Sequence, residues 1–193
     1  QLDIFVTNGH VADDVERVQS RVTYAQPPHL FRNRGNGEFE EVVPDPNGVL
    51  ARPSVGRGAA YGDLDNDGDL DIVVTTNDGP AQIIRNDVPR TGNMLRVQLI
   101  GTASNRDGIG ARVEIELKDE PTIWRLVKTG SSYASQSERP ITFGLAKTVV
   151  VNSLRVTWPS GQTDVVADVV ANQSITVREY DGIIAATPIG YAQ

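Results

Sequence analysis

Five aspartates occupy every second position of the stretch GDLDNDGDLDIVV, residues 62–74, and their side chains are the most chemically suggestive in the chain. They are Asp63, Asp65, Asp67, Asp69 and Asp71. Carboxylates at such short spacing repel one another unless a positive charge lies between them. Because an apolar β-branched run follows directly, the charges lie next to a predicted strand. A positively charged partner is therefore needed to neutralise the carboxylates.

The spacing matches the first half of a calcium-binding loop. Counted from Asp63, the aspartates fall at positions 1, 3, 5, 7 and 9, and Gly68 stands at position 6, where an EF-hand makes its sharp turn. An EF-hand also needs a bidentate glutamate at position 12 and a following helix, but position 12 here is Val74. We therefore predict a compact Dx[DN]xDGxxD loop that leads into a strand, with Asp71 closing the cage.

Calcium is the ion that suits this donor set best. It is a hard cation that takes six to eight oxygen ligands in loose geometry. No cysteine occurs in the chain and no histidine lies near the loop, which disfavours zinc and copper. The alternative interpretation is a solvated acidic turn, because Asp-Gly and Asn-Asp are common in turns. We predict Ca²⁺ as the cofactor, with all five aspartates of the loop as metal-site residues.

Catalytic motifs are not found in the sequence. His10 and His29 are the only histidines, and neither lies in a recognisable pattern with a nucleophile. The nucleophile elbow, the His-Glu-x-x-His motif and the phosphate-binding glycine loop are all missing. The polar stretch GSSYASQ, residues 130–136, fits a turn or strand edge better than a ligand site. We therefore predict that the protein is not an enzyme.

Strand patterns dominate the rest of the chain. Alternating apolar residues in MLRVQLI, ARVEIEL, SLRVTW and SITVRE predict inward-facing side chains at Leu95, Val97, Leu99, Val113, Ile115, Leu117, Leu154, Val156, Trp158, Ile175 and Val177. Gly, Asn, Asp and Pro clusters separate the runs, including NRGNG (33–37) and SNRDGIG (104–110), which we interpret as hairpin turns. Residues 11–22 contain the one helical stripe, at Val11, Val15, Val18 and Val22, although a surface loop fits nearly as well. The fold class is all-β.

An internal repeat organises the first half. LDIFVTNG (2–9) resembles LDIVVTTND (70–78), and HLFRN (29–33) resembles QIIRN (82–86), which aligns Asp3 with Asp71. The first copy starts within the repeat, so we expect the chain to be the C-terminal piece of a longer protein.

The acidic residues are concentrated in the first half of the chain. Residues 1–90 contain fifteen acidic and eight basic residues, whereas residues 91–193 contain ten of each. The second half therefore has no basic excess for nucleic acid, and no apolar run reaches the length of a membrane span.

These motifs together resemble a known domain pair. GRGAAYGDLDNDGDLDIVVTTN and LFRNRGNGEF resemble FG-GAP/VCBS repeats, the blades of integrin-type β-propellers. SNRDGIGARV, GSSYASQ, ITFGL and VTWPSGQTD resemble, in order, the markers of the ASPIC/UnbV domain of cartilage acidic protein-like secreted proteins. The resemblance implies partial propeller blades (1–90), a small antiparallel β-sandwich or barrel-like domain (91–180) and an apolar tail (181–193). It also implies calcium ligands at Asp63, Asp65, Asp67 and Asp71, and a backbone carbonyl ligand from Asp69.

The resemblance implies secretion to the extracellular space or cell surface, and it carries no general enzymatic activity. We expect a non-catalytic module for adhesion, structural support or self-assembly, including assembly into a filament. The alternative is an accessory or carbohydrate-binding domain of a secreted enzyme. The unpaired first repeat and the charge-free tail GIIAATPIGYAQ predict self-association, with glycans and other extracellular proteins as further candidate partners. A tail folded back on its own domain is the other interpretation.

Overall fold

The structure is a computed structural model that describes residues 2–89, 91–118 and 120–190. It divides into two compact units that are not contiguous in sequence. The first unit comprises the residues up to Gly62 together with Asp71–Asn86 and Ser131–Gln136. The second comprises Asp63–Leu70, Asp87–Gly130 and the residues from Ser137 onward. None of the helices in these described ranges is long and apolar enough to cross a bilayer.

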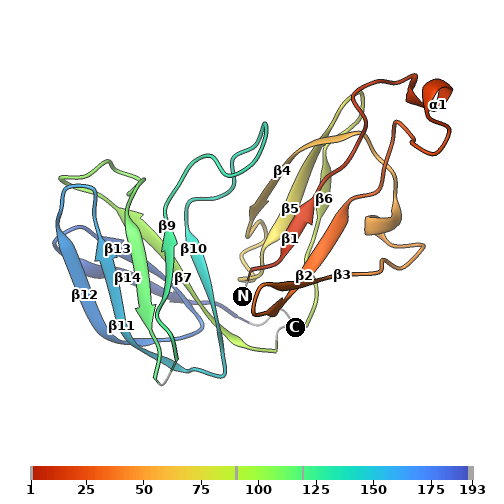
Figure 1. Ribbon diagram of the computed structural model, residues 1–193. Helices are drawn as coiled ribbons and strands as arrows, with labels where there is room; N and C mark the ends of the chain where they lie inside the picture. Colours follow the sequence, from red (N-terminus) through yellow and green to blue (C-terminus); the bar gives the residue numbers. More distant parts are fainter. Residues whose placement is uncertain (1, 90, 119, 191–193) are drawn as a thin grey trace. The chain divides into compact units, whose positions relative to one another are not determined.

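The first unit is built from two antiparallel sheets of three strands each (Figure 1). One sheet has the order β1-β2-β3 and the other has the order β4-β5-β6. The strands are β1 (Ile4–Val6), β2 (His29–Gly35), β3 (Glu38–Glu41), β4 (Gly56–Gly62), β5 (Asp71–Thr76) and β6 (Gln82–Ile84). A short helix α1 (Val15–Val18) and a single 3-10 turn η1 (Val49–Ala51) lie in the connections.

The two copies of the sequence repeat form the same strand pair in the same register. Ile4 faces Phe31 in the β1–β2 pair, and their repeat equivalents Ile72 and Ile84 face each other in the β5–β6 pair. The predicted hairpin turn at residues 33–37 is confirmed, because it joins the paired strands β2 and β3. Both copies of the repeat therefore consist of a strand, a connection and a second strand that pairs with the first.

The predicted helical stripe at residues 11–22 is wrong in extent. Only four residues form α1, and of the valines in the stripe only Val15 is buried. Val11 and Val18 are 87% and 81% exposed. A helix this short has no second turn on which i and i+4 side chains could form a continuous apolar face. The segment is mostly a surface loop, as the alternative interpretation had it.

The second unit is a sandwich of two four-stranded sheets (Figure 1). One sheet has the order β10-β7-β13-β14 and the other has the order β12-β11-β8-β9. The strands are β7 (Asn93–Ile100), β8 (Arg112–Glu116), β9 (Ile123–Leu126), β10 (Ile141–Ala146), β11 (Val150–Thr157), β12 (Thr163–Val170), β13 (Gln173–Arg178) and β14 (Gly182–Pro188). All neighbours are antiparallel except β7 and β13, which are parallel.

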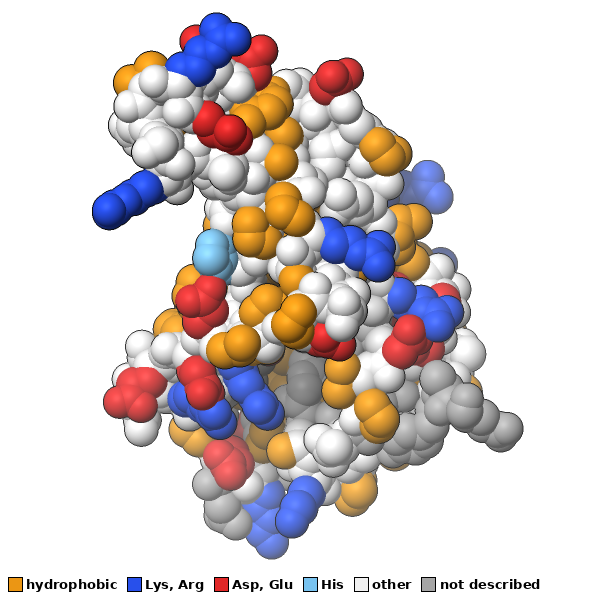
Figure 2. Space-filling model, turned by 90° about the vertical axis from the view of Figure 1, so that its right-hand side faces the viewer, with side chains coloured by type: hydrophobic (Ala, Val, Ile, Leu, Met, Phe, Trp, Pro, Cys, Tyr) orange, Lys and Arg blue, Asp and Glu red, His pale blue; other side chains and the backbone are white. Residues whose placement is uncertain are grey.

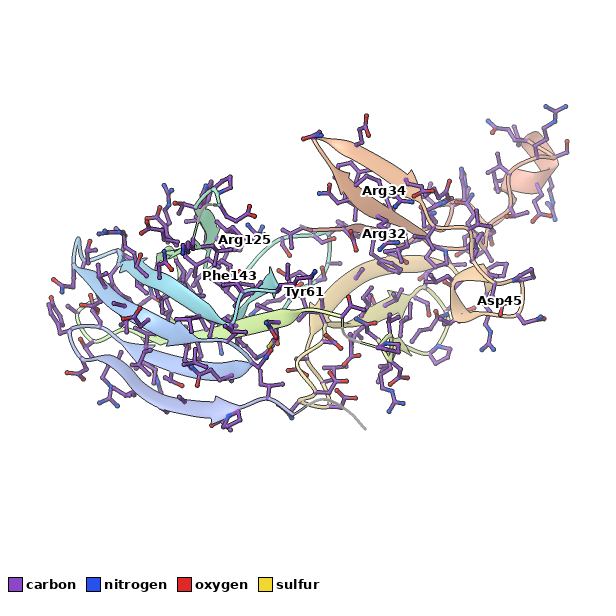
Figure 3. The ribbon with its side chains drawn as sticks, turned by 90° about the horizontal axis from the view of Figure 1, so that it is seen from below. Arg32, Arg34, Asp45, Tyr61, Arg125 and Phe143 are labelled. Atoms are coloured by element: carbon purple, nitrogen blue, oxygen red, sulfur yellow. The ribbon has the colours of Figure 1, made fainter. Side chains whose placement is uncertain are left out.

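The main hydrophobic core lies between these two sheets. Every apolar side chain predicted to face inward from the four alternating runs is buried, from Leu95 on β7 to Val177 on β13. At the margin of the core, the Arg125 guanidinium of β9 lies 6.0 Å from the centre of the Phe143 ring of β10 (Figure 3). The prediction of an all-β fold with a largely antiparallel β-sandwich is confirmed, with β7 and β13 as its one parallel pair, and neither sheet closes into a barrel within the described residues.

The first unit, in contrast, buries few apolar side chains. Val15 and Val74 are its only fully buried hydrophobic residues among those described, whereas Leu2, Ile4 and Phe39 are exposed. Figure 2 shows several patches of exposed hydrophobic side chains on the face that it displays. Two sheets of three short strands offer too little area to bury both of their faces.

Two expectations about the connections of the second unit need correction. The turn at residues 104–110 is not a hairpin turn, because β7 and β8 belong to different sheets and the segment carries the chain from one to the other. The apolar tail is not free along its whole length. Residues Gly182–Pro188 form β14 and pair with β13 of the same chain. The rest of the predicted tail includes residues 191–193, which lie outside the described residues.

Candidate metal site

The aspartate loop is the turn of the β4–β5 hairpin. The strands end in the pair Gly62 and Asp71, and residues 63–70 connect them. Within the loop, Asn66 and Gly68 have φ angles of 62° and 93°, in the left-handed region. Glycine enters this region without steric cost and asparagine tolerates it. Gly68 thus makes the sharp turn that the sequence predicts, and the turn folds the aspartates toward one another.

Three aspartates of the loop come together. Asp63, Asp65 and Asp67 each offer a carboxylate oxygen, and these oxygens all lie within 4.8 Å of one another. The side chain of Asp65 is exposed, whereas those of Asp63 and Asp67 are more shielded. Three like charges at this separation repel, by about 1 kcal/mol per pair even with the screening of bulk water. A cation among the oxygens would convert this repulsion into attraction.

The surroundings of the Asp63 carboxylate show whether a metal ion fits the loop. Its side chain is only 3% exposed, and its Oδ1 atom is buried without a hydrogen-bond partner. The other oxygen, Oδ2, lies 3.6 Å from Nη1 of Arg96. A buried carboxylate oxygen with no partner is costly and needs a compensating ligand. Oxygen donors with one orphaned buried atom fit a hard cation such as Ca²⁺.

Arg96 and Glu138 adjoin the loop and were not predicted as site residues. Arg96 on β7 donates two hydrogen bonds to Glu138, from Nη1 to Oε1 at 2.7 Å and from Nη2 to Oε2 at 2.5 Å. Glu138 Oε2 also accepts a hydrogen bond from the backbone N–H of Asp63, at 3.1 Å. Neither residue belongs to a functional motif, and Arg96 occupies an ordinary polar position in an alternating strand pattern. No sequence signal could have placed them beside Asp63.

Asp69 and Asp71 make different contacts from the other three aspartates. The Asp69 backbone N–H donates to Asp67 Oδ1 at 2.9 Å. Asp71 is buried at the start of β5, and its Oδ1 accepts from the Asn86 backbone N–H at 2.9 Å. The equivalent bond in the first copy joins Asn33 N–H to Asp3 Oδ1 at 2.8 Å. This bond therefore belongs to the repeat itself, and the roles of Asp69 and Asp71 as metal ligands stay predictions.

A second buried carboxylate, Glu179, lies just beyond β13 and was also missed by the motif search. Its Oε2 accepts from the backbone N–H groups of Thr102, Ala103 and Ser104, at 2.7–2.8 Å. Its Oε1 accepts from the hydroxyl groups of Ser104 and Ser160. Burial raises the pKa of the Glu179 carboxyl, but these hydrogen bonds, above all that from Ser104, outweigh burial and lower the pKa to about 2. The protein itself thus supplies every partner that this anion needs.

Both histidines have local partners. His10 Nδ1 accepts from the Ala12 backbone N–H at 3.0 Å, within its own loop. His29 on β2 is hydrogen-bonded to Glu41 on the neighbouring strand β3, and both side chains are about half exposed. Neither contact resembles a base activating a nucleophile. The stretch at residues 130–136 is a loop with one isolated bridge, between Ser132 and Ser135, as expected of a turn.

Comparisons with known proteins match the two halves of the chain separately. The model of the FG-GAP-like repeat matches residues 1–74, and the model named ASPIC and UnbV matches residues 101–184. These are the two domain types, in the same order, that the motifs resemble, so the predicted resemblance is confirmed.

Three curated relatives are all named Cartilage acidic protein 1. The protein from Homo sapiens is 31% identical over 136 residues, which cover 69% of this chain and 20% of the relative. The protein from Mus musculus is 29% identical over the same extent. The protein from Xenopus tropicalis is 33% identical over 110 residues, which cover 55% of this chain and 17% of the relative. The chain thus spans about a fifth of the length of the relatives that it matches.

Proposed function

We propose that this chain, in which an FG-GAP-like repeat region precedes an ASPIC and UnbV domain, is a calcium-binding, non-catalytic extracellular module for adhesion or structural support. The observation that carries the calcium assignment is that Asp63, a residue of the cluster with Asp65 and Asp67, has a buried Oδ1 atom without a hydrogen-bond partner. Asp63, Asp65 and Asp67 would hold the ion. The extracellular location is inferred from the relatives named Cartilage acidic protein 1.

A bound ion would stabilise the turn between β4 and β5 rather than perform chemistry. Calcium sites in extracellular modules have dissociation constants on the order of 10⁻⁴ to 10⁻³ M. Ion binding to the folded state alone raises stability by mass action. The module would then be rigid where calcium is plentiful and looser where it is scarce, which suits an adhesive or structural role outside the cell.

Isothermal titration calorimetry with CaCl₂ tests the assignment. The wild-type chain should bind one calcium ion at the loop, with a dissociation constant on the order of 10⁻⁴ to 10⁻³ M. Asp65→Ala and Asp67→Ala should each abolish this binding. Asp13→Asn, which neutralises an exposed aspartate outside the loop, is the matched control and should bind as the wild type does. If the wild type takes up no calcium and chelation leaves its melting temperature unchanged, the loop is only an acidic turn.

Self-association through β14 is part of the proposal. This strand lies at the edge of its sheet and contains no charged residue, and Ala185, Ala186, Thr187 and Pro188 are exposed. Three of the other edge strands carry features that block pairing: β12 has Asp164 and Asp168, β3 has three glutamates, and β10 has a register shift near its end. We propose a second copy of the chain as the occupant of this edge, since uncharged strands can pair with one another.

Light scattering across a concentration series, with calcium present, tests this association. Ala186→Lys places a charge on the β14 edge and should shift the molar mass toward the monomer. Val165→Lys places the same charge on an exposed position of the β12 edge and should leave the mass unchanged. A wild type that stays monomeric at every concentration, or an Ala186→Lys chain that assembles equally well, would contradict the proposal.

A carbohydrate-binding role is the second candidate function, and one observation favours it. Trp124 on β9 is 47% exposed, and the Arg112 guanidinium lies 4.6 Å from the centre of its ring. An exposed indole beside polar side chains is a surface on which a sugar ring can stack. A glycan array should then show binding that Trp124→Ala removes and Tyr133→Ala retains. Absence of binding to any glycan would leave the adhesive or structural role.

A further inference from the structure

The pair formed by Arg96 and Glu138 is the feature that the calcium assignment does not use. The two side chains are 11% and 13% exposed, and they form a bidentate ion pair between guanidinium and carboxylate. Both also reach Asp63: Glu138 through the Asp63 backbone N–H and Arg96 through Oδ2. The first residue of the loop is therefore held at its backbone and at one of its two carboxylate oxygens.

We propose that Arg96 and Glu138 are positioning residues for the calcium loop, an inference that rests on the proposed calcium site. Arg96 holds Asp63 Oδ2 and so leaves Oδ1 as the oxygen available to an ion. Glu138 fixes the backbone at the point where the chain leaves β4 and enters the loop. Together they tie the ion site to strand β7 and to the segment before β10.

The geometry of arginine explains why this residue type stands here. A guanidinium presents several N–H donors in one rigid plane, so it can bind both oxygens of Glu138 and still face Asp63. A lysine ammonium has the same charge but no fixed fork, and it could not hold both carboxylates in one arrangement. Residues that orient the ligands of a metal typically change its affinity 10- to 100-fold when they are replaced.

The sign of the effect separates positioning from simple electrostatics. A positive side chain near a calcium site repels the ion, so removal of Arg96 should tighten binding if charge alone mattered. Positioning predicts the opposite result, because Asp63 and Glu138 lose the group that orients them. The two explanations of Arg96 therefore give opposite shifts of the same dissociation constant.

Calcium titration of Arg96→Gln and Arg96→Lys by calorimetry tests the proposal. We expect each variant to bind calcium about 10-fold more weakly than the wild type. Arg139→Gln is the matched control: it removes the same charge from the neighbour of Glu138, where Arg139 forms an exposed ion pair with Asp107 at 2.7 Å. The control should keep the wild-type affinity. Unchanged or tighter binding in Arg96→Gln would overturn the positioning role.

Melting curves in EDTA accompany the titrations and show whether each variant is folded. If Arg96→Gln is unfolded without calcium, the charge-conserving variant Arg96→Lys decides, with wild-type affinity overturning the proposal. If the wild type binds calcium and both variants bind it with the same affinity, the positioning role is contradicted but the calcium site is not. If the wild type binds no calcium, both proposals are contradicted.

Discussion

Asp63 and Glu179 are two buried carboxylates in the same unit, and they differ in how far their oxygens are satisfied by hydrogen bonds. Glu179 is 1% exposed and receives hydrogen bonds from three successive backbone N–H groups and two hydroxyl groups. Asp63 is 3% exposed at its side chain, and one of its oxygens receives none. A buried anion needs compensation in either case. The protein supplies this compensation to Glu179, whereas at Asp63 we propose that an external cation supplies it.

Glu179 is a structural carboxylate, whereas Asp63 has the features expected of a metal ligand. The loop at residues 102–104 turns its N–H groups toward Glu179, as backbone concavities do around anions. The loop at residues 63–70 instead gathers further carboxylates around Asp63. Additional negative charge around an unsatisfied anion is unfavourable, and a bound cation would offset it. Substitutions at each of the two carboxylates therefore test whether they differ in this way.

Replacing Glu179 should have the largest effect on stability, with or without calcium. Glu179→Ala leaves the N–H groups of residues 102–104 without their acceptor, and buried donors without partners are costly. We expect a lower melting temperature in both EDTA and CaCl₂, by the same amount. Differential scanning calorimetry under the two conditions measures this. A loss that calcium repairs would show that Glu179 belongs to the ion site after all.

Calcium should give the next largest effect, and only through the loop. At 100 times its dissociation constant, a ligand of the folded state adds about 2.7 kcal/mol to the free energy of unfolding. The rise should appear in the wild type and in Glu179→Gln, and it should vanish in Asp63→Ala. Urea unfolding with and without CaCl₂ measures the difference. An equal rise in all three chains would place the ion elsewhere.

Asp63→Asn should change the sign of its effect with calcium. In EDTA, the neutral amide no longer repels Asp65 and Asp67 and can donate to them, so we expect about 1 kcal/mol of added stability. In CaCl₂, the variant lacks a charged ligand and should be less stable than the wild type. The same unfolding experiment measures both. Destabilisation in EDTA would mean that the Asp63 carboxylate is already satisfied without an ion.

Acid should remove the contribution of Glu179 within a defined pH range. The pKa of this carboxyl is about 2 in the folded state against a usual value of 4.5, so the unfolded chain takes up the proton first as the pH falls. The stabilisation is complete above about pH 4.5 and is lost as the pH approaches 2. The difference in melting temperature between the wild type and Glu179→Gln should therefore shrink between these values. A constant difference would contradict the lowered pKa.

Ser160→Ala should give the smallest change at this carboxylate. It removes one hydroxyl donor and leaves the three backbone N–H groups and the Ser104 hydroxyl in place. We expect a small fall in melting temperature at neutral pH and a pKa of Glu179 that moves up toward its usual value. NMR titration of the Glu179 side chain measures that pKa. An unchanged value would assign the lowering to the backbone N–H groups alone.

Features that depend on local chemistry and short-range periodicity could be predicted from the amino-acid sequence. Alternation of apolar residues fixed which side chains of β7, β8, β11 and β13 enter the core, because successive strand residues point to opposite faces. The spacing of Asp63, Asp65 and Asp67 around Gly68 indicated an oxygen cage, because ligands and turn lie within one short loop. The repeat predicted that the two copies share one arrangement, and in the structure Ile4 pairs with Phe31 as Ile72 pairs with Ile84.

Features that depend on contacts between residues far apart in the chain could not be predicted from the sequence. Arg96 and Glu138 are 42 residues apart and meet at Asp63, and Glu179 meets a loop that lies about 75 residues before it. No local pattern encodes these meetings, because they follow from the order of strands in the sheets. The same holds for β14: its lack of charge is visible in the sequence, but only pairing with β13 made it an edge strand of its own domain. Long-range packing thus determines that the chain satisfies the carboxylate of Glu179 and leaves one oxygen of Asp63 without a hydrogen-bond partner.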